Sequence, residues 1–316
     1  MPDLRIGVVG ATGAVGTVTL ELLAERGFGD VRAFASHRSA GSAVRYGDGE
    51  LVVEEATPEA LAAGGLDLVF FSVGTEASRE LVPHAVRGGA VAIDKSDAYR
   101  LTDGIPLVVA GVNDHVLNGD EIVANPNCSA MQLACALAPL HEAAGLERVR
   151  LATYQSASGA GDAGIQKLQA IAPAEGDLSM DWDLDGEEFS EEWKLRAETR
   201  KILGLPELPL HATCVRVPVL VGHSQAIWVE TEDRVRPEQA RLLLAAAPHV
   251  RLQDFATPGD AAGTDEVLVG RIRQDSTEEG LALWAVNDNL RKGAALNAIQ
   301  IAELILARES VSLPTS

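Results

Sequence analysis

Short runs of aliphatic residues alternate with segments of helical periodicity through the first part of the chain. The run at 4–9 ends in a glycine-rich turn, after which Val15, Val18, Leu22 and Leu23 recur at the spacing of an amphipathic helix. Strands that alternate with helices are typical of a mostly parallel, doubly wound sheet. Further strands are predicted at 31–35, 51–54, 68–72, 90–93, 107–112 and 122–124, and a helix at 78–86.

The pattern changes after Cys128. A helix is predicted from this cysteine to about residue 141, and a second one near 165–171. Alternating apolar and polar residues at 213–219, 225–230, 267–273 and 281–286 predict an antiparallel sheet. The acidic segment 173–185 has few aliphatic residues and is the expected mobile loop. The last predicted helix runs from residue 291 to about residue 308.

Chain length favours two domains, because 316 residues exceed the roughly 100–200 residues of a usual domain. The change of pattern predicts an α/β domain at 1–127 and an α+β domain with a mainly antiparallel sheet at 128–290. The last helix, within 291–316, is expected to return to the first domain and complete it.

Composition excludes several classes of protein. A formal charge of −20 makes nucleic acid a poor partner, because a phosphate backbone is bound by clustered Lys and Arg. No apolar run approaches the roughly 18 residues of a membrane span, and the first residues lack the pattern of a secretion signal. Three cysteines are an odd number, which argues against a disulfide framework and for the reducing cytoplasm. Their spacing does not match a zinc site, so no metal is expected.

The glycine turn is the first candidate for ligand binding. Gly10, Gly13 and Gly16 leave room for a diphosphate to approach N–H groups at the start of the following helix, whose partial positive charge suits it. Ordinary strand-to-helix turns also contain such glycines, but the position at the first such junction favours a dinucleotide.

The residues after the second predicted strand bear on which dinucleotide binds. Enzymes that use NAD usually carry an acidic residue here, which binds the ribose 2′-hydroxyl. This chain has Ser36-His37-Arg38-Ser39 instead, so no carboxylate repels a 2′-phosphate. Arg38 could be an ordinary surface arginine, yet its position favours NADP.

Cys128 is the candidate nucleophile. It lies between a strand-like run and an apolar helix, and the N-terminus of a helix lowers a thiol pKa and supplies N–H groups for an oxyanion. The alternative is a small buried residue without chemistry. That alternative fits Cys135 and Cys214 better, because both lie inside apolar runs.

Three polar residues in the acidic second half are further candidates. His223 follows Gly222 in a segment expected to turn between two strands, and it is either structural or an acid/base. Arg216 and Lys194 are scarce cations there, so they are either solvated or bind an anion.

Several motifs follow one another in order along nearly the whole chain. They are the segments 10–16, 38–41, 125–129, 154–155, 158–161, 198–202, 216–219, 222–224, 288–290 and 292–295. Together they closely resemble the motifs of aspartate-semialdehyde dehydrogenases. The spacing of the Cys, Gln, Arg and His residues is specific to this family rather than to dinucleotide-binding proteins at large.

The resemblance implies a Rossmann-like NADP-binding domain and a substrate-binding and dimerisation domain. The implied reaction is the NADPH-dependent reduction of L-aspartyl 4-phosphate to L-aspartate 4-semialdehyde with release of phosphate, a step towards lysine, threonine and methionine. The implied partners are these small molecules and further copies of the chain, in a homodimer or homotetramer.

The resemblance also implies roles for individual residues. Cys128 would form an acyl thioester, His223 would be the acid/base, and Gln155 would orient the substrate. Arg216 would bind the substrate carboxylate, and Glu191 its ammonium. The residues implied to bind phosphate or the neighbouring substrate are Arg100, Asn127 and Lys194, and those implied around the cofactor are Gly10, Thr12, Gly13, Ala14, Val15, Ser36, Arg38, Ser39, Ser72, Gly74, Ser158, Gly159 and Asn289.

The chain departs from the family pattern at a few positions. The family commonly has Thr where Ala130 stands, Asn where Lys95 stands, and Pro-Glu where Ala110 and Gly111 stand. None of these departures removes a residue with an implied chemical role.

Two rival functions fit the sequence less well. N-acetyl-γ-glutamyl-phosphate reductases resemble this fold and thioester route, but their cysteine usually lies in a Gly-Cys-Tyr-Pro setting, unlike the segment 127–130. A non-catalytic NADP-binding paralogue would be expected to lose Cys128, His223 or Arg216, and all three are present.

Overall fold

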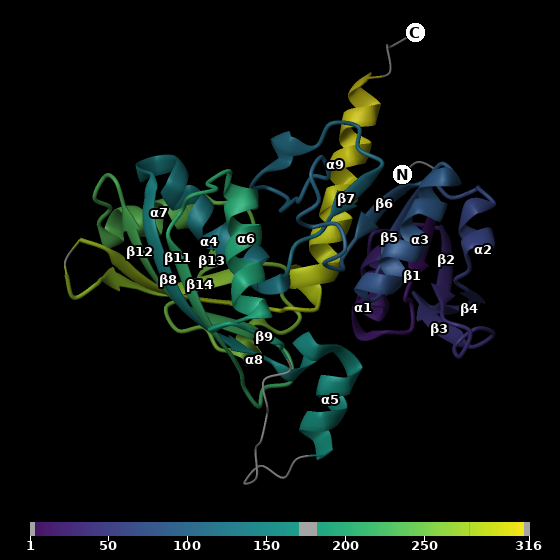
Figure 1. Cartoon of the computed structure of the whole chain (residues 1–316), viewed down its shortest axis with the longest axis horizontal. Helices are drawn as coiled ribbons and strands as arrows, with labels where there is room; N and C mark the ends of the chain where they lie inside the picture. Colours follow the sequence, from purple (N-terminus) through teal and green to yellow (C-terminus); the bar gives the residue numbers. More distant parts are fainter. Residues whose placement is uncertain (1–3, 171–181, 278, 313–316) are drawn as a thin grey trace. The chain divides into compact units, whose positions relative to one another are not determined.

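The computed structural model describes residues 4–170, 182–277 and 279–312, which belong to two compact units (Figure 1). The N-terminal unit comprises Met1–Pro126 and Ala294–Ser316, and the C-terminal unit comprises Asn127–Gly293. Each unit contains its own large sheet. The expected mobile loop at 173–185 lies largely outside the described residues.

The N-terminal unit is built on a seven-stranded sheet with the order β3-β4-β2-β1-β5-β6-β7. All neighbouring strands are parallel except β3 and β4, which pair antiparallel at one edge. The predicted doubly wound α/β fold is therefore confirmed. The strands are β1 (Arg5–Val9), β2 (Asp30–Ala35), β3 (Ala43–Tyr46), β4 (Gly49–Glu55), β5 (Leu68–Phe71), β6 (Val91–Asp94) and β7 (Ile122–Ala124).

Helices pack on both faces of this sheet. On one face, α1 (Ala14–Glu25) and α9 (Asn297–Ser312) contribute residues such as Leu23 and Ile299 to one apolar cluster. On the other face, α2 (Pro58–Ala62) and α3 (Thr75–Arg87) contribute Leu61 and Val82 to a second cluster. A short 3₁₀ helix, η1 (Asp114–Val116), precedes β7. Because both faces are covered, strands such as β5 are apolar throughout.

One strand predicted in this unit is wrong, since residues 107–112 form only an isolated bridge. Side-chain amides take the place of a strand ladder: Asn113 Oδ1 accepts from the N–H of Val109 at 2.8 Å, and Asn297 Oδ1 accepts from the N–H of Ala110 at 3.0 Å. The apolar run predicted burial correctly. Sheet pairing was decided by polar side chains that the hydrophobic pattern does not reveal.

The C-terminal unit contains a six-stranded sheet with the order β11-β8-β12-β15-β14-β13. The pairs β8–β12, β12–β15 and β15–β14 are antiparallel, whereas β8–β11 and β13–β14 are parallel. The prediction of a mainly antiparallel sheet is confirmed, although the two parallel pairs were not foreseen. The strands are β8 (Leu146–Gln155), β11 (Leu210–Arg216), β12 (His223–Thr231), β13 (Val250–Leu252), β14 (Val267–Gln274) and β15 (Leu281–Asn287).

Among the described residues of this unit, four helices contact the sheet: α4 (Cys128–Ala144), α6 (Ser190–Leu203), α7 (Pro237–Ala246) and the short α8 (Pro258–Ala261). The predicted helix after Cys128 is α4, and the one predicted near 165–171 is α5 (Gly161–Ala170) as far as the structure describes it. The predicted last helix begins as π-helix, η3 (Arg291–Leu296), and continues as α9. The remaining elements are η2 (Ala157–Ala160), β9 (Leu184–Asp185) and β10 (Glu188–Phe189).

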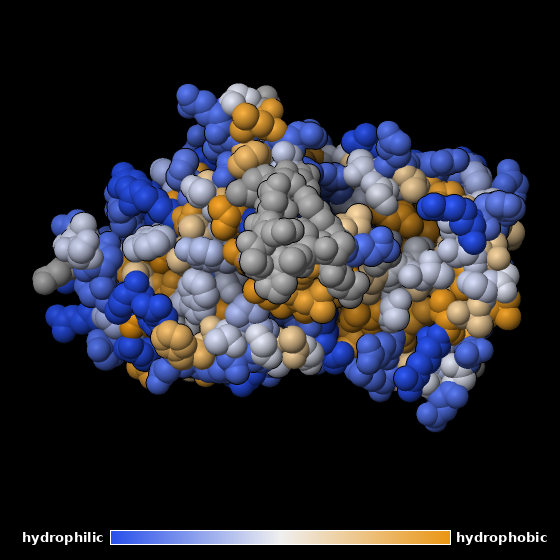
Figure 2. All heavy atoms as spheres, turned by 90° about the horizontal axis from the view of Figure 1, so that it is seen from below, coloured by the Kyte–Doolittle hydropathy of each residue, from blue (hydrophilic) through white to orange (hydrophobic). Residues whose placement is uncertain are grey.

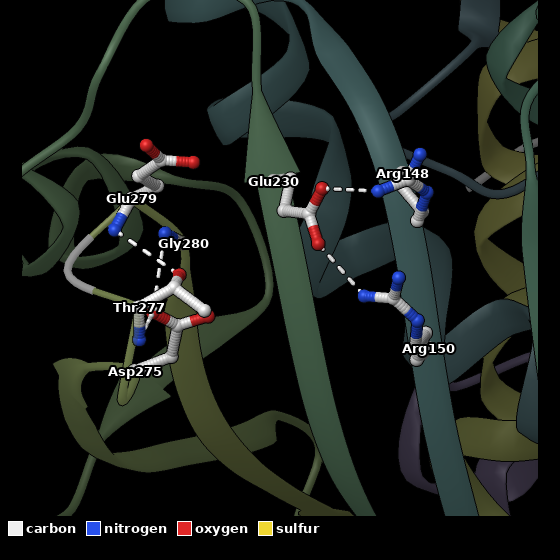
Figure 3. A network of polar contacts seen from close by, with 7 residues as sticks. All are labelled: Arg148, Arg150, Glu230, Asp275, Thr277, Glu279 and Gly280. Atoms are coloured by element: carbon white, nitrogen blue, oxygen red, sulfur yellow. Dashed lines mark hydrogen bonds and ion pairs between the residues drawn. The ribbon is translucent and has the colours of Figure 1, made fainter.

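The face of this sheet opposite the buried side chains carries large exposed residues. Tyr154 and Trp228 are 37% and 41% exposed, and Trp228 pairs across the strands with Arg150. Glu230 accepts from both Arg148 and Arg150 at 2.7 Å, so two positions of β8 are tied to one of β12 (Figure 3). Side chains alternate across a strand, which places these residues away from α4.

The molecular surface mixes residue types. Hydrophilic and hydrophobic residues are interspersed on the face shown in Figure 2. Among the helices that the structure describes, none has the length and apolar character needed to cross a membrane.

Candidate active site

Cys128 is the first residue of α4, and Asn127 caps this helix. The Asn127 side-chain oxygen accepts from the N–H groups of Ser129 and Ala130, at 2.8 and 3.3 Å. Cys128 is partly exposed, and Gly293 leaves room beside it, because a Cβ there would lie 2.9 Å from the Cβ of Cys128. The sulfur therefore lies at the positive end of a helix dipole, which stabilises a thiolate.

Cys135 and Cys214 are buried in the same unit. Burial raises the pKa of the Cys135 thiol, and it raises the pKa of Cys214 to about 12. Both groups therefore remain thiols at neutral pH. Of the three cysteines, Cys128 is the one suited to nucleophilic attack.

Glu191 contacts two other predicted site residues, Asn127 and Gln155, near the start of α4. Glu191, in the first turn of α6, accepts through Oε1 from Asn127 Nδ2 and from Gln155 Nε2, both at 3.0 Å. Glu198, further along α6, accepts from the backbone N–H of Asn127 at 2.6 Å. Two buried carboxylates of α6 therefore fix the residue that precedes Cys128. The role of Glu198 was not predicted, and its only signal in the sequence was its place in the motif 198–202.

His223, the first residue of β12, is fully buried. Its Nδ1 accepts from the backbone N–H of Ser156 at 3.1 Å, so the proton of the neutral ring lies on Nε2. Among the described residues, nothing pairs with this Nε2. Burial and the charge of Arg216 lower the pKa of His223 to about 3. The neutral imidazole therefore presents one N–H donor that is available to a ligand.

Arg216, the last residue of β11, lies close to His223. Its Nη1 donates to the carbonyl oxygen of Ser156 at 2.9 Å, and its guanidinium lies 4.6 Å from the ring centre of Trp182. A Cβ at Gly159 would lie 2.7 Å from Arg216 Nη1 and 2.9 Å from His223 Nε2. The absence of a side chain at position 159 therefore leaves a space that both functional groups border.

Asn289 joins the loop after β8 to the turn before β12. Its Oδ1 accepts from the N–H of Gly222 at 2.9 Å and from Ser156 Oγ at 3.0 Å, and its Nδ2 donates to Ser158 Oγ at 3.0 Å. Ser156 thus contacts both Asn289 and His223. Sequence analysis missed Ser156, which lies between the motifs 154–155 and 158–161.

The glycine turn of the N-terminal unit has the geometry of a phosphate cradle. Gly10 has a φ of +83°, and a Cβ there would lie 2.3 Å from the carbonyl oxygen of Ser72. A Cβ at Gly16 would lie 2.0 Å from the carbonyl oxygen of Gly10, whereas a Cβ at Gly13 would meet nothing closer than 3.6 Å. No side chain caps α1, so the N–H groups of its first turn suit a diphosphate. The predicted residues Thr12, Gly13, Ala14 and Val15 all lie in this turn or at the start of α1.

The other predicted cofactor residues of this unit follow β2 and β5. Arg38 is exposed, and its guanidinium has no hydrogen-bond or ion-pair partner among the described residues. Ser36 and Ser39 form one turn, in which the Ser39 N–H donates to the Ser36 carbonyl oxygen at 2.9 Å. Ser72 follows β5, and Gly74 precedes α3 without a side-chain cap. The donors of this unit therefore suit an anionic dinucleotide.

The two predicted phosphate-binding cations belong to different units. Arg100 is buried in the N-terminal unit, where its Nε donates to the Asn125 carbonyl oxygen at 3.0 Å and its Nη2 to that of Lys95 at 2.7 Å. Lys194 is half-buried on α6 of the C-terminal unit. The predicted cofactor-binding residues also belong to both units. Ser158, Gly159 and Asn289 lie in the C-terminal unit, and the others lie in the N-terminal unit.

Family models match most of the chain. Residues 5–119 match the NAD binding domain of semialdehyde dehydrogenases, and residues 137–292 match their dimerisation domain. The N-terminal match covers the glycine turn, and the C-terminal match covers Gln155, Arg216 and His223.

Individual relatives match over nearly their full length. The aspartate-semialdehyde dehydrogenase of Corynebacterium glutamicum is 44% identical, with 95% of this chain and 99% of that protein covered, and that of Bacillus subtilis is 40% identical, with 95% and 96% covered. The structure of aspartate semialdehyde dehydrogenase II from Vibrio cholerae, complexed with ASA, has a TM-score of 0.91 at 38% identity and covers 97% of this chain and 99% of that one. The Candida albicans enzyme, solved with NADP, has a TM-score of 0.79 at 26% identity, with 97% and 99% covered. With its glycine turn, its helix-capped cysteine and these full-length matches, the chain belongs to the aspartate-semialdehyde dehydrogenase family.

Proposed function

We propose that this chain reduces L-aspartyl 4-phosphate to L-aspartate 4-semialdehyde with NADPH, releasing phosphate, through a thioester on Cys128. The observation that carries the proposal is the presence, within one unit, of a cysteine at a helix N-terminus and a buried histidine whose Nε2–H has no partner among the described residues. Such a pair suits a route in which a nucleophile and a proton donor act in turn.

Acylation is the first step. The Cys128 thiolate attacks the acyl carbon of the substrate, and the positive end of the α4 dipole stabilises the tetrahedral oxyanion. The C–O bond to the phosphate then breaks, which leaves a thioester on Cys128 and free phosphate. Asn127 keeps this helix start in place because Glu191 and Glu198 hold its side chain and its backbone.

Reduction is the second step. The glycine turn of the N-terminal unit would hold NADPH, which would supply the hydride that reduces the thioester. His223 would give its Nε2 proton to the oxygen of the resulting thiohemiacetal and later take that proton back, so that the C–S bond breaks, the aldehyde leaves and the Cys128 thiolate is restored. The Ser156 N–H at Nδ1 supports this role, because it keeps the proton of the neutral ring on Nε2.

Substrate recognition uses two groups of opposite charge. Arg216 would bind the α-carboxylate, and Glu191 the ammonium, while Gln155 orients the acyl group. The contact between Gln155 and Glu191 at 3.0 Å supports a shared site for these two side chains. Phosphate binding by Arg100 and Lys194 stays a prediction from the family resemblance.

NADP is the proposed form of the cofactor. The N-terminal unit matches an NAD binding domain, and the exposed Arg38 lies where a 2′-phosphate is recognised in related folds. A guanidinium that pairs with none of the described residues is suited to such a group.

A homodimer is the proposed assembly. The dimerisation-domain match covers the six-stranded sheet, whose face away from α4 exposes Tyr154 and Trp228. Aromatic side chains of this kind are enriched at the centre of protein interfaces. The mixture of apolar residues with Arg148, Arg150 and Glu230 resembles an interface with a polar rim.

The test is the reverse reaction: phosphate-dependent reduction of NADP with L-aspartate semialdehyde. We expect turnover that requires phosphate, and none with N-acetyl-glutamate semialdehyde. Intact-protein mass after mixing with L-aspartyl 4-phosphate, without NADPH, should show one acyl adduct on Cys128. His223→Asn should lower kcat by about 10²–10⁴ and still acylate. An adduct that survives Cys128→Ser, or maps to Cys214, would contradict the mechanism.

A further inference from the structure

Lys95 is a buried lysine of the N-terminal unit, directly after β6. Its Nζ donates to Thr19 Oγ1 of α1 at 2.6 Å and to Ser72 Oγ after β5 at 2.9 Å. It also lies 5.6 Å from the ring centre of Phe70. The amine therefore connects α1, the helix that follows the glycine turn, with the residue that follows β5.

Among the described residues, no carboxylate contacts the Lys95 amine. Asp94 is the nearby acid, but its two oxygens accept from Ser78 Oγ and Ser96 Oγ, both at 2.6 Å. Arg100 donates to the backbone carbonyl of Lys95. Burial lowers the pKa of Lys95 to about 7, against an opposing effect of Asp94. Near neutral pH the amine can therefore gain or lose a proton.

Ser72 places this amine next to the glycine turn. The Ser72 N–H donates to the carbonyl oxygen of Val9 at 2.8 Å. The Ser72 carbonyl oxygen lies so close to Gly10 that a Cβ there would be 2.3 Å from it. In parallel α/β sheets, dinucleotides bind at the carboxyl ends of the strands that flank this turn. Ser72 and Lys95 follow two such strands, β5 and β6.

The hydrogen bonds also determine the direction of the two hydroxyl groups. A protonated Lys95 can only donate, so Thr19 and Ser72 both accept from it. The Thr19 hydroxyl proton goes to the carbonyl oxygen of Val15 at 2.8 Å. The half-buried Ser72 hydroxyl keeps its own proton for a group outside these contacts. An anionic oxygen of a ligand at the turn is a suitable acceptor for that proton.

We propose that Lys95 is a positioning residue for the dinucleotide, whose ammonium orients the Ser72 hydroxyl towards the cofactor and holds a positive charge beneath its diphosphate. The inference rests on the proposed use of a nicotinamide dinucleotide. It concerns the diphosphate and so applies to NAD and NADP alike. The anion favours the charged amine, so cofactor binding above pH 7 should take up a proton at Lys95.

Calorimetry of NADP binding in buffers of different ionisation enthalpy tests this without turnover. Wild type should take up more proton at about pH 8 than at about pH 6, because the amine is already charged at the lower pH. Lys95→Gln keeps a donor for Thr19 and Ser72 but cannot be charged. The Lys95→Gln variant should not show the extra proton uptake at pH 8, and its affinity for NADP at pH 6 should be about tenfold lower than that of wild type. Arg45→Gln, which removes an exposed cation of the same unit, should behave as wild type.

A second measurement does not depend on a variant that folds. The chain contains five lysines, so selective ¹³C labelling gives few side-chain signals to follow. One lysine signal should titrate near neutral pH, and its midpoint should rise when NADP binds. No such signal in wild type, or proton uptake that Lys95→Gln retains, overturns the role of Lys95. Failure of wild type to bind either dinucleotide overturns the proposed cofactor as well.

Discussion

The backbone N–H of Ser156 donates to Nδ1 of His223 at 3.1 Å. This one bond decides which ring nitrogen carries the proton in the neutral form, because a backbone N–H can only be a donor. It leaves the Nε2–H of a fully buried ring without a partner among the residues that the structure describes. A histidine held in this form can donate a hydrogen bond to a substrate oxygen without first becoming positively charged.

The buried histidine should make stability depend on pH. The folded-state pKa of His223 is lowered to about 3, whereas an unfolded histidine titrates near 6.5. The unfolded chain therefore binds the additional proton between these values, so stability present above pH 6.5 is lost as the pH falls towards 3. Between pH 7 and pH 4, the free energy of unfolding of wild type should therefore fall by on the order of 3 kcal/mol more than that of His223→Asn.

Urea unfolding at a series of pH values measures that difference. His115→Asn is the matched control, because His115 is an exposed histidine of the other unit. An identical pH dependence in wild type and His223→Asn would show that His223 is not buried as a neutral ring.

Gly159→Ala should damage catalysis more than folding. The added methyl group would lie within 3 Å of both Arg216 and His223, so both side chains must move. Displacement of reacting groups by about 1 Å costs on the order of 10²-fold in rate, and we expect kcat/KM to fall by that order. Gly29→Ala serves as the control, since a Cβ there meets nothing within 4 Å. Full activity of Gly159→Ala, measured at an unchanged melting temperature, would refute the proposed arrangement.

Alkylation should distinguish the three cysteines. Iodoacetamide reacts with thiolates, so at pH 7 it should modify Cys128 first. Cys135 and Cys214 should react only after unfolding, because both are buried with a raised thiol pKa. Peptide mass spectrometry over time gives the order of modification, and Cys214→Ala should leave the first rate unchanged. Earlier labelling of Cys214 than of Cys128 would contradict this ranking.

Arg38→Ala should change cofactor preference. A lost charged hydrogen bond costs about 1.5–3 kcal/mol, so the KM for NADPH should rise at least about tenfold. The KM for NADH should barely change, because NADH has no 2′-phosphate. Steady-state kinetics with both cofactors provides the test, with Arg45→Ala on β3 as a control for the loss of one exposed arginine. An equal rise for both cofactors would mean that Arg38 does not recognise the phosphate.

Local sequence patterns predicted the elements whose neighbours in the chain decide their structure. The run before Gly10 and the periodic residues after it predicted β1 and α1, and Asn127 and Cys128 are at the start of a helix as expected. The family predicted from the motifs is the one that the comparisons show. By contrast, residues 107–112 were wrongly predicted as a strand because Asn113 and Asn297 bind their backbone.

The sequence by itself therefore determined the doubly wound first sheet, the mainly antiparallel second sheet and the family, because periodicity and motif spacing are local properties of the chain. The nucleophilic role of Cys128 stays a prediction. Only the tertiary structure decided that Ser156 fixes the proton of His223, that Glu198 holds the residue before Cys128, and that Lys95 contacts Ser72. Each of these pairs is separated by more than twenty residues in the chain. Hydrogen bonds require atoms to come within about 3 Å with the right direction, and for such distant residues only the packing of strands and helices provides that geometry.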